Sequence, residues 1–288
     1  MTTTIEPGAA GPDSAEVGKA RVRKEDEHLI TGRTRWTDNL VLPGMLHIAI
    51  LRSPFAHARI TNIDVEAAKT MPGVVAVYTG ADFADEQASL PNAMQITPDM
   101  LVPPAPSIAV DTVRFAGEAV AIVVARDPYA AHDALENIDI DYDDLPVVLD
   151  LAAAASDGAD LVYPDLGTNV QAVWVFDSAE AGTGSSMDDA IRDAEVVVER
   201  TLRQQRLIPA FMEPRSVVVD PTGAQITMWS ATQVPHILRL MLAMTLGIPE
   251  HKLRVIAPDV GGGFGGKLQV CPEAVSYTHL TLPTSDLV

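Results

Sequence analysis

The chain has only one cysteine, Cys271, among its 288 residues. One thiol excludes an intrachain disulfide, and it cannot by itself hold an iron–sulfur cluster or a structural zinc ion, which take several cysteine or histidine ligands. Cysteine scarcity also fits a reducing compartment. If the protein carries out redox chemistry, its electrons must therefore leave through another chain.

Positive charge and long apolar runs are also scarce. Lys and Arg number 20 against 39 Asp and Glu, a formal net charge of −19. Binding to nucleic acid needs clustered Lys and Arg, so we exclude nucleic acid as a partner. No segment reaches the ~18 consecutive apolar residues of a membrane-spanning helix. Residues 1–17 lack the apolar core of a secretory signal and the arginines of a twin-arginine signal, so we expect a flexible tail and a cytoplasmic protein.

The hydrophobic patterning predicts an α+β protein with two folded regions. With 47% hydrophobic residues, the chain can build a core in each. Alternation and apolar runs predict strands over residues 45–51, 74–79, 119–125, 138–142, 196–202, 216–220 and 225–229. Helices are expected over residues 65–70, from Pro128 to about 137, from Ser185 or Ser186 through 194, and from Pro235 to Leu246 with Gly247 as the stop.

A glycine-rich loop follows the apolar run at residues 253–257. Residues 258–267 read PDVGGGFGGK, with five glycines in seven positions. Because glycine lacks a Cβ, such a stretch lets main-chain N–H groups converge on one anionic ligand. The expectation is that something approaches this backbone closely.

Two common phosphate-binding motifs match this loop, and neither has its usual context. Gly261-x-Gly263-x-x-Gly266 has the dinucleotide spacing, while Gly261-x-x-x-x-Gly266-Lys267 has most of a P-loop. Leu268 stands where a P-loop needs Ser or Thr, and Cys271-Pro272 interrupts the helix that a dinucleotide turn should open. A plain glycine-rich turn is the third alternative.

The residues leading into the loop carry a family resemblance. The stretch from Trp229 to Lys267, with Thr232-Gln233 and the glycines, resembles the molybdopterin-binding subunit of the molybdenum hydroxylases, the xanthine dehydrogenase and aldehyde oxidase family. It is most similar to the large chain of aerobic carbon monoxide dehydrogenase-like members. Residues 52–60 and 71–74 are similar to the α/β hammerhead domain that opens that subunit. The resemblance covers about residues 18–273.

That resemblance implies a domain order and a cofactor. The expected parts are a tail, a hammerhead domain, a linker and the first part of a molybdopterin-binding α+β domain, at residues 1–17, 18–144, 145–160 and 161–273. The cofactor would be molybdenum–molybdopterin in its cytosine dinucleotide form. Residues 274–288 show no resemblance, and residues 275–284 look like a translated sequencing adapter. We expect an artefact there, and an N-terminal fragment before it.

The family resemblance implies that five residues contact the cofactor. The amide of Gln233 would lie against an oxygen ligand of molybdenum, and Gly262, Gly263, Phe264 and Gly265 would line the cofactor. The local sequence supports the same placement, because Gln233 precedes a helix whose free N–H groups favour an anionic group. No catalytic residue is expected within the chain, since the family's glutamate base lies further along than this sequence reaches.

Side chains near these segments are expected to be structural. The segment Phe211-Met212-Glu213-Pro214-Arg215 also resembles the family, in which it lies near the cofactor, and its Glu213 and Arg215 are predicted to form a simple buried ion pair. His57, Arg59, His236 and Arg239 are assigned no chemistry, and Cys271 lies on the wrong segment to be the copper-binding cysteine of carbon monoxide oxidisers.

The implied function is oxidation of a small carbon substrate, with water as the oxygen source. The alternatives for the substrate are carbon monoxide, an aldehyde or an N-heterocycle. Xanthine is disfavoured, because Leu268 stands where purine-oxidising relatives have a glutamate. Electrons would pass to a small subunit with 2Fe-2S clusters and a medium FAD subunit, in a heteromer that self-associates. The fragment would be inactive alone. The alternative is a non-catalytic nucleotide-binding or assembly module.

Overall fold

The computed structural model describes residues 19–281, apart from 86–87, 93–94, 176–181 and 183–185. The chain divides into two units, Met1–Arg35 and Trp36–Val288. The described part of the first unit contains the short helix α1 (Asp26–Ile30), which starts beside an ion pair between Arg23 Nε and Asp26 Oδ1 at 2.9 Å. The elements below all belong to the second unit.

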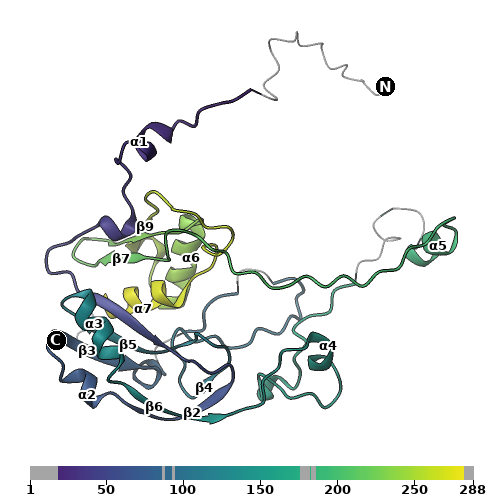
Figure 1. The fold of residues 1–288 in the computed structure, drawn as a ribbon, viewed down its shortest axis with the longest axis horizontal. Helices are drawn as coiled ribbons and strands as arrows, with labels where there is room; N and C mark the ends of the chain where they lie inside the picture. The colour runs from purple at the N-terminus through teal and green to yellow at the C-terminus, as the bar shows by residue number, and fades with distance from the viewer. Residues whose placement is uncertain (1–18, 86–87, 93–94, 176–181, 183–185, 282–288) are drawn as a thin grey trace. The chain divides into compact units, whose positions relative to one another are not determined.

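The first half of the second unit is built on two three-stranded antiparallel sheets (Figure 1). One has the order β1-β5-β3, formed by His47–Arg52, Ala119–Ala125 and Val74–Thr79. The other has the order β4-β2-β6, formed by Thr112–Val113, Ala58–Asp64 and Asp139–Asp144. The predicted strands over residues 74–79 and 119–125 are confirmed at the same bounds, whereas β2 and β4 were not predicted.

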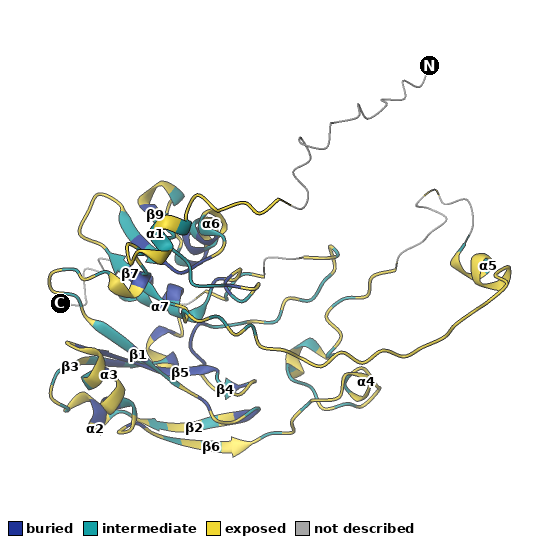
Figure 2. Ribbon diagram, turned by 45° about the horizontal axis from the view of Figure 1, so that its top comes forward, coloured by how far each residue is buried: buried dark blue, intermediate teal, exposed yellow. Residues whose placement is uncertain are grey.

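Strand β5 is the centre of this half, and every one of its residues is buried (Figure 2). A continuous apolar run is typical of a strand covered on both faces, because neither face has to meet water. Helix α3 (Pro128–Leu135) packs against all three strands of its sheet, and α2 (Glu66–Lys69) packs on β3. Asp127 caps α3 by accepting hydrogen bonds from the N–H groups of Tyr129 and Ala130. The buried core there includes Ala49, Val77, Val123, Ala131 and Ala134.

The second half contains one mixed sheet of order β7-β8-β9. Strands β7 (Val217–Asp220) and β8 (Ile226–Ser230) are antiparallel, while β9 (Leu253–Ile256) runs parallel to β8. Helix α6 (Pro235–Leu246) connects β8 to β9 and begins and ends where the sequence predicts, with Gly247 in the left-handed conformation at φ 65°. Its Leu238 and Leu242 lie in a core with Met228 and Leu253.

The parallel pair β8 and β9 positions the candidate site. Its register pairs Trp229 with Ile256, so the carboxyl ends of both strands lie at the same edge of the sheet. Gln233 follows β8 and the glycine-rich loop follows β9. Two segments separated by more than twenty residues in the sequence are therefore brought together by strand direction alone.

Shorter elements complete the described chain. Helix α4 (Leu151–Ala154) lies within the expected linker, and α5 (Met187–Arg192) is capped by Ser186, whose hydroxyl accepts from the Asp189 N–H. Ser185, the other candidate cap, lies outside the described residues. Helix α7 (Pro272–Thr281) packs on β7 and α6. Single 3₁₀ turns occupy Thr37–Asn39, Gly80–Phe83, Pro164–Leu166 and Glu250–Lys252.

One predicted strand is wrong. Residues 196–202 form no strand, and they are exposed throughout. The sequence alternates as a strand should, but a strand also needs a neighbour for its main-chain N–H and C=O groups, and no described segment pairs with this one. In the part of the chain that the structure describes, no helix has both the length and the apolar character needed to cross a bilayer.

Replacing Ile122 with alanine should strongly destabilise the protein. Ile122 is fully buried at the centre of β5, and truncating such a side chain costs about 2–5 kcal/mol through lost burial and a residual cavity. Val75→Ala on β3, where the side chain is about half exposed, is the control and should cost about 1 kcal/mol or less. Urea unfolding measures both, and equal losses would contradict the assignment of β5 as the core strand.

Candidate functional site

Gln233 is bound to the glycine-rich loop through both its main chain and its side chain. Its N–H donates to the Lys267 carbonyl at 3.1 Å. Its Oε1 accepts from the N–H groups of Gly265 and Lys267, at 3.1 and 3.3 Å. Two converging donors fix which end of the amide faces the loop, because only the oxygen can accept. The amide NH₂ of Gln233 has no hydrogen-bond partner among the described residues.

Three of the loop's glycines are required by the chain's own side chains. A Cβ at Gly263 would lie 2.4 Å from Gln233 Oε1, and one at Gly261 would lie 2.5 Å from Glu213 Cβ. At Gly266 it would lie 2.8 Å from the ring of Phe211. No real Cβ fits at such distances. The expected close approach to this backbone is thus made by Glu213, Gln233 and Phe211, and a ligand is not needed to explain these positions.

The tip of the loop has a different character. Phe264 has φ 47°, in the left-handed region that non-glycine residues rarely occupy, and the residue is 75% exposed. Gly262, two residues before it, and Gly265, directly after it, also have positive φ, at 95° and 85°. The N–H groups of Gly262, Gly263 and Phe264 donate no hydrogen bond to any described residue. Consecutive free N–H groups with alternating backbone handedness form a concave site for anionic or acceptor groups.

A buried ion pair ties the two ends of the loop together. Lys267 Nζ lies 3.1 Å from Glu213 Oε2, and the two side chains are only 1% and 11% exposed. The same carboxylate oxygen accepts from the Gly261 N–H at 2.7 Å, and the Glu213 N–H donates to the Gly261 carbonyl at 3.2 Å. Lys267 Nζ also lies 4.7 Å from the centre of the Phe211 ring. Glu213 is thus in a buried ion pair, but its partner is Lys267 and not the predicted Arg215.

The position of Lys267 bears on the P-loop alternative. A P-loop lysine extends its ammonium group to a phosphate, whereas the Lys267 ammonium is buried and bonded to Glu213. Sequence reasoning gave Glu213 an ion pair but did not find Lys267 as the partner or Phe211 as the ring beneath the loop. The available signal was Glu213 two residues after Phe211, in a segment that the family resemblance already placed near the loop.

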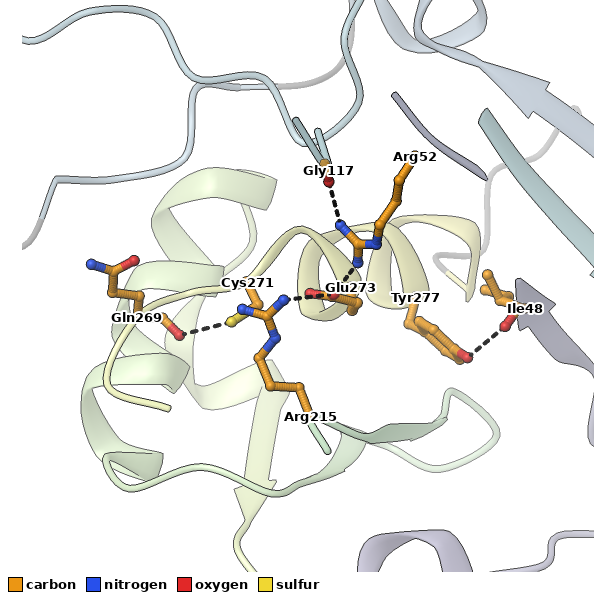
Figure 3. Close-up of polar contacts among 8 residues, drawn as sticks. All are labelled: Ile48, Arg52, Gly117, Arg215, Gln269, Cys271, Glu273 and Tyr277. Carbon is orange, nitrogen blue, oxygen red and sulfur yellow. Dashed lines mark hydrogen bonds and ion pairs between the residues drawn. The ribbon is translucent and has the colours of Figure 1, made fainter. Parts of the chain in front are cut away.

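Arg215 forms a second ion pair, at the end of the loop segment (Figure 3). One oxygen of Glu273 accepts from Arg215 at 3.2 Å and from Arg52 of β1 at 2.5 Å, and Arg52 also donates to the Gly117 carbonyl. The first half of the unit is thereby joined to the segment after the glycine loop. The predicted buried pair of Arg215 with Glu213 is therefore wrong, because Arg215 is paired with Glu273 and its side chain is 40% exposed. Tyr277 of α7 adds a hydrogen bond from its hydroxyl to the Ile48 carbonyl at 3.4 Å.

Cys271 lies beside this cluster, where its thiol donates to the Gln269 carbonyl at 3.6 Å. Burial raises the pKa of the Cys271 thiol. The group therefore stays protonated at neutral pH, and a protonated thiol is neither a nucleophile nor a good metal ligand. Within the described ranges, no three His, Cys, Asp or Glu side chains are placed to hold a metal ion together.

The remaining polar candidates have structural surroundings. His57 Nδ1 lies 2.6 Å from the Pro146 carbonyl, and Arg239 of α6 is paired with Glu250. His236 is exposed at the start of α6. The structure thus brings together all five predicted cofactor residues, and it adds Glu213, Phe211 and Lys267 as the groups that hold them.

The comparisons with known proteins identify the family. A model of the aldehyde oxidase and xanthine dehydrogenase a/b hammerhead domain matches residues 31–146, and a model of the molybdopterin cofactor-binding domain matches residues 165–288. The chain belongs to the aldehyde oxidase and xanthine dehydrogenase family of molybdopterin proteins. The second match includes residues 274–288, whose assignment as an artefact stays a prediction.

Particular relatives include the carbon monoxide dehydrogenase large chain of Afipia carboxidovorans, 36% identical over 282 residues. The nicotine 6-hydroxylase large subunit of Paenarthrobacter nicotinovorans is 37% identical over 275 residues. These alignments cover 93% of this chain, and 34% and 32% of the relatives. The crystal structure of quinoline 2-oxidoreductase from Pseudomonas putida 86 matches with TM-score 0.80 and 38% identity, over 92% of this chain and 33% of that one. The chain thus spans about a third of the relatives' length, and the predicted fold class is confirmed.

Glu213→Gln should destabilise the protein far more than an exposed ion-pair substitution does. Losing the carboxylate leaves the Lys267 ammonium buried and uncompensated, a situation that costs about 3–5 kcal/mol. Glu250→Gln, which removes the half-exposed pair with Arg239, is the matched control and should cost about 1 kcal/mol or less. Urea unfolding followed by tryptophan fluorescence compares them.

The double variant Glu213→Gln/Lys267→Met removes both charges. It should be less destabilised than the sum of its single variants, because no unpaired charge then remains in the interior. If Glu213→Gln and Glu250→Gln have the same effect, the buried pair does not hold the loop.

Proposed function

We propose that this chain is the N-terminal part of the molybdopterin-binding large subunit of a molybdenum-dependent oxidoreductase. One observation carries the proposal. The free N–H groups of Gly262, Gly263 and Phe264 lie on a loop that Gln233 binds directly, and the NH₂ of Gln233 is also free among the described residues. In this family, the matched domain binds the molybdopterin cofactor.

The chemistry of this donor set fits such a cofactor. Its phosphate and metal-bound oxygens are acceptors, and the free N–H groups of the loop tip and the NH₂ of Gln233 are donors. The one carboxylate in contact with the loop, Glu213, is buried and compensated by Lys267, so it does not repel an anion at the exposed face. A loop already fixed by the chain's own side chains loses little conformational freedom when a ligand binds.

Each residue then has a definite task. When bound, the molybdenum centre supplies the oxidation of an electrophilic carbon with oxygen from water. Gln233 would hold an oxygen ligand of the metal through its amide N–H, and the N–H groups of Gly262 to Phe264 would hold acceptor atoms of the cofactor. Phe264 closes one wall and limits access of water. Gly265 contributes through Gln233, since its N–H is bound to that side chain.

The partners and substrate follow at the level of the family. With one cysteine in its sequence, this chain needs 2Fe-2S clusters and FAD on a small and a medium subunit to carry electrons away. The proposal includes the cytosine dinucleotide form of the cofactor, self-association of the heteromer and a cytoplasmic location. The names of the relatives, which include "large chain" and "large subunit", support a multi-subunit enzyme.

The substrate is proposed to be carbon monoxide, an aldehyde or an N-heterocycle. Leu268 lies directly after the loop, and its side chain is 45% exposed. An apolar group there offers no hydrogen bond to a purine, so xanthine is disfavoured. The nucleotide-binding alternative gains no support, because the buried ammonium of Lys267 is already bound to Glu213.

Two proposals depend on how the gene continues: that residues 274–288 are an artefact, and that the chain alone is inactive because it is only part of the enzyme. Sequencing the source locus across codon 273 should show a frame that continues into further cofactor-binding sequence. An authentic stop codon shortly after codon 284 would refute both the artefact and the enzyme, and would leave a binding module.

Gln233→Glu should strongly reduce cofactor loading without destabilising the fold. The new carboxylate still accepts from Gly265 and Lys267, but it presents an anionic oxygen where the NH₂ stood. Losing a hydrogen bond to a charged group costs about 1.5–3 kcal/mol, so loading should fall about tenfold or more. The readout is molybdenum and pterin content of the continuing chain, expressed with its partner subunits. Gln225→Ala, which removes a surface hydrogen bond to His251, is the control and should load normally.

A further inference from the structure

An open cavity of about 440 Å³ lies beside Gly266, the last glycine of the loop. Two arginines, Arg52 and Arg215, line it together with Glu273 and several apolar residues, and we call it the two-arginine cavity. Its volume is within the range of small-molecule sites, roughly 300–1,000 Å³. The residues proposed above to contact the cofactor are not among those that line it, so the cavity needs an explanation of its own.

The two arginines converge on a single carboxylate oxygen, that of Glu273 Oε1 (Figure 3). Arg52 is the last residue of β1, and Arg215 lies two residues before β7, so side chains from both halves of the second unit meet here. Glu273 is the one acidic residue among those that line the cavity. Two positive charges and one negative charge leave one positive charge uncompensated, in a protein whose formal net charge is −19.

Both arginines keep donors that are accessible to a ligand. Their side chains are 37% and 40% exposed, whereas the Glu273 side chain is only 16% exposed. Arg52 donates to the Gly117 carbonyl and to Glu273, and Arg215 donates to Glu273. A guanidinium has more N–H groups than these bonds use, and they form a planar fork that matches a carboxylate. Glu273 therefore holds the two guanidiniums side by side without saturating them.

The rest of the cavity wall is apolar, with Ile208, Pro209, Phe211 and Pro214. The Phe211 ring is fixed in place, because Lys267 Nζ lies 4.7 Å from its centre and a Cβ at Gly266 would lie 2.8 Å from it. Proline has no main-chain N–H, so two of these four residues add no donor that could compete with the arginines. Apolar walls with a few convergent polar groups are typical of sites for small organic molecules.

We infer that the two-arginine cavity binds the carboxylate of a small organic acid that has an apolar or aromatic body. The carboxylate pairs with Arg52 and Arg215, and the body lies against Phe211 and the two prolines. A charge-assisted pair of this kind supplies direction, and burial of the body supplies the rest of the affinity. The inference goes beyond the proposed function, because it concerns a site separate from the donors of the loop tip and does not need the cofactor.

Titration of the 288-residue chain with three probes tests the inference. Benzoate should bind saturably and shift the amide resonance of Gly266, which lines the cavity. Benzamide has the same shape without the charge, and acetate has the charge without the aromatic body. Each should bind at least about tenfold more weakly than benzoate, because each lacks one of the two interactions that the cavity offers.

Substitutions in the cavity should change benzoate binding in opposite directions. Arg52→Gln and Arg215→Gln should each weaken it about tenfold or more, because each removes a charged donor and leaves Glu273 paired with the other arginine. Glu273→Gln should strengthen it about threefold or more, since two guanidiniums then lack a counter-charge. A purely structural role for Glu273 predicts a loss instead. Arg254→Gln, at an exposed position of β9 outside the cavity, is the matched control and should leave binding unchanged.

Three results would overturn the inference: no saturable binding of benzoate to the folded chain, benzamide binding as tightly as benzoate, or arginine variants that bind like Arg254→Gln. Loss of binding in Gln233→Glu but not in Arg215→Gln would place the acid at the loop tip and would also refute it. If the chain does not fold alone, the same titrations are made on the continuing chain with its partner subunits, where the same outcomes decide. Because none of these measurements reports cofactor loading, the proposed function is tested independently.

Discussion

The carboxylate of Glu213 is the constraint on which the candidate site depends. One of its oxygens bonds both the N–H of Gly261, the first glycine of the loop, and the ammonium of Lys267, the last residue of the loop. Because both side chains are almost fully buried, the bond is not screened by solvent, and its loss would leave a charge in the interior. Gln233 then fixes the second half of the loop. The N–H groups of Gly262 to Phe264 at the tip make no hydrogen bond to a described residue.

This arrangement explains why the loop resembles two nucleotide-binding motifs and is neither. Glycines at positions 261, 263 and 266 make room for Glu213, Gln233 and Phe211. Contacts within the protein therefore explain the glycine spacing. The lysine that would mark a P-loop is a structural cation. Donors are presented by main-chain N–H groups and one amide, which bind an anionic or acceptor group without placing a net positive charge at the site. Such a site selects by geometry more than by long-range attraction.

The parts of the fold that have a local sequence signal could be predicted from the sequence. Helix α6 is flanked by Pro235 and Gly247, and β5 is a continuous apolar run, so both could be placed at their observed bounds. The family resemblance supplied Gln233 and the loop, and strand direction explains why they meet. Pairing between distant residues, such as Lys267 with Glu213 or Glu273 with Arg52, leaves no periodic signal and could not be predicted. The strand expected at residues 196–202 shows the converse: its alternation indicates a strand, but no described segment pairs with it.

The central claim is that the loop tip and Gln233 form one donor set that receives the cofactor. A crystal structure of the continuing chain with its cofactor bound tests this most directly. We expect the N–H groups of Gly262, Gly263 and Phe264 and the Gln233 NH₂ within hydrogen-bond distance, about 3 Å, of acceptor atoms of the cofactor, with the Glu213–Lys267 pair unchanged. A cofactor bound away from these donors, or held by Lys267 released from Glu213, would contradict the account.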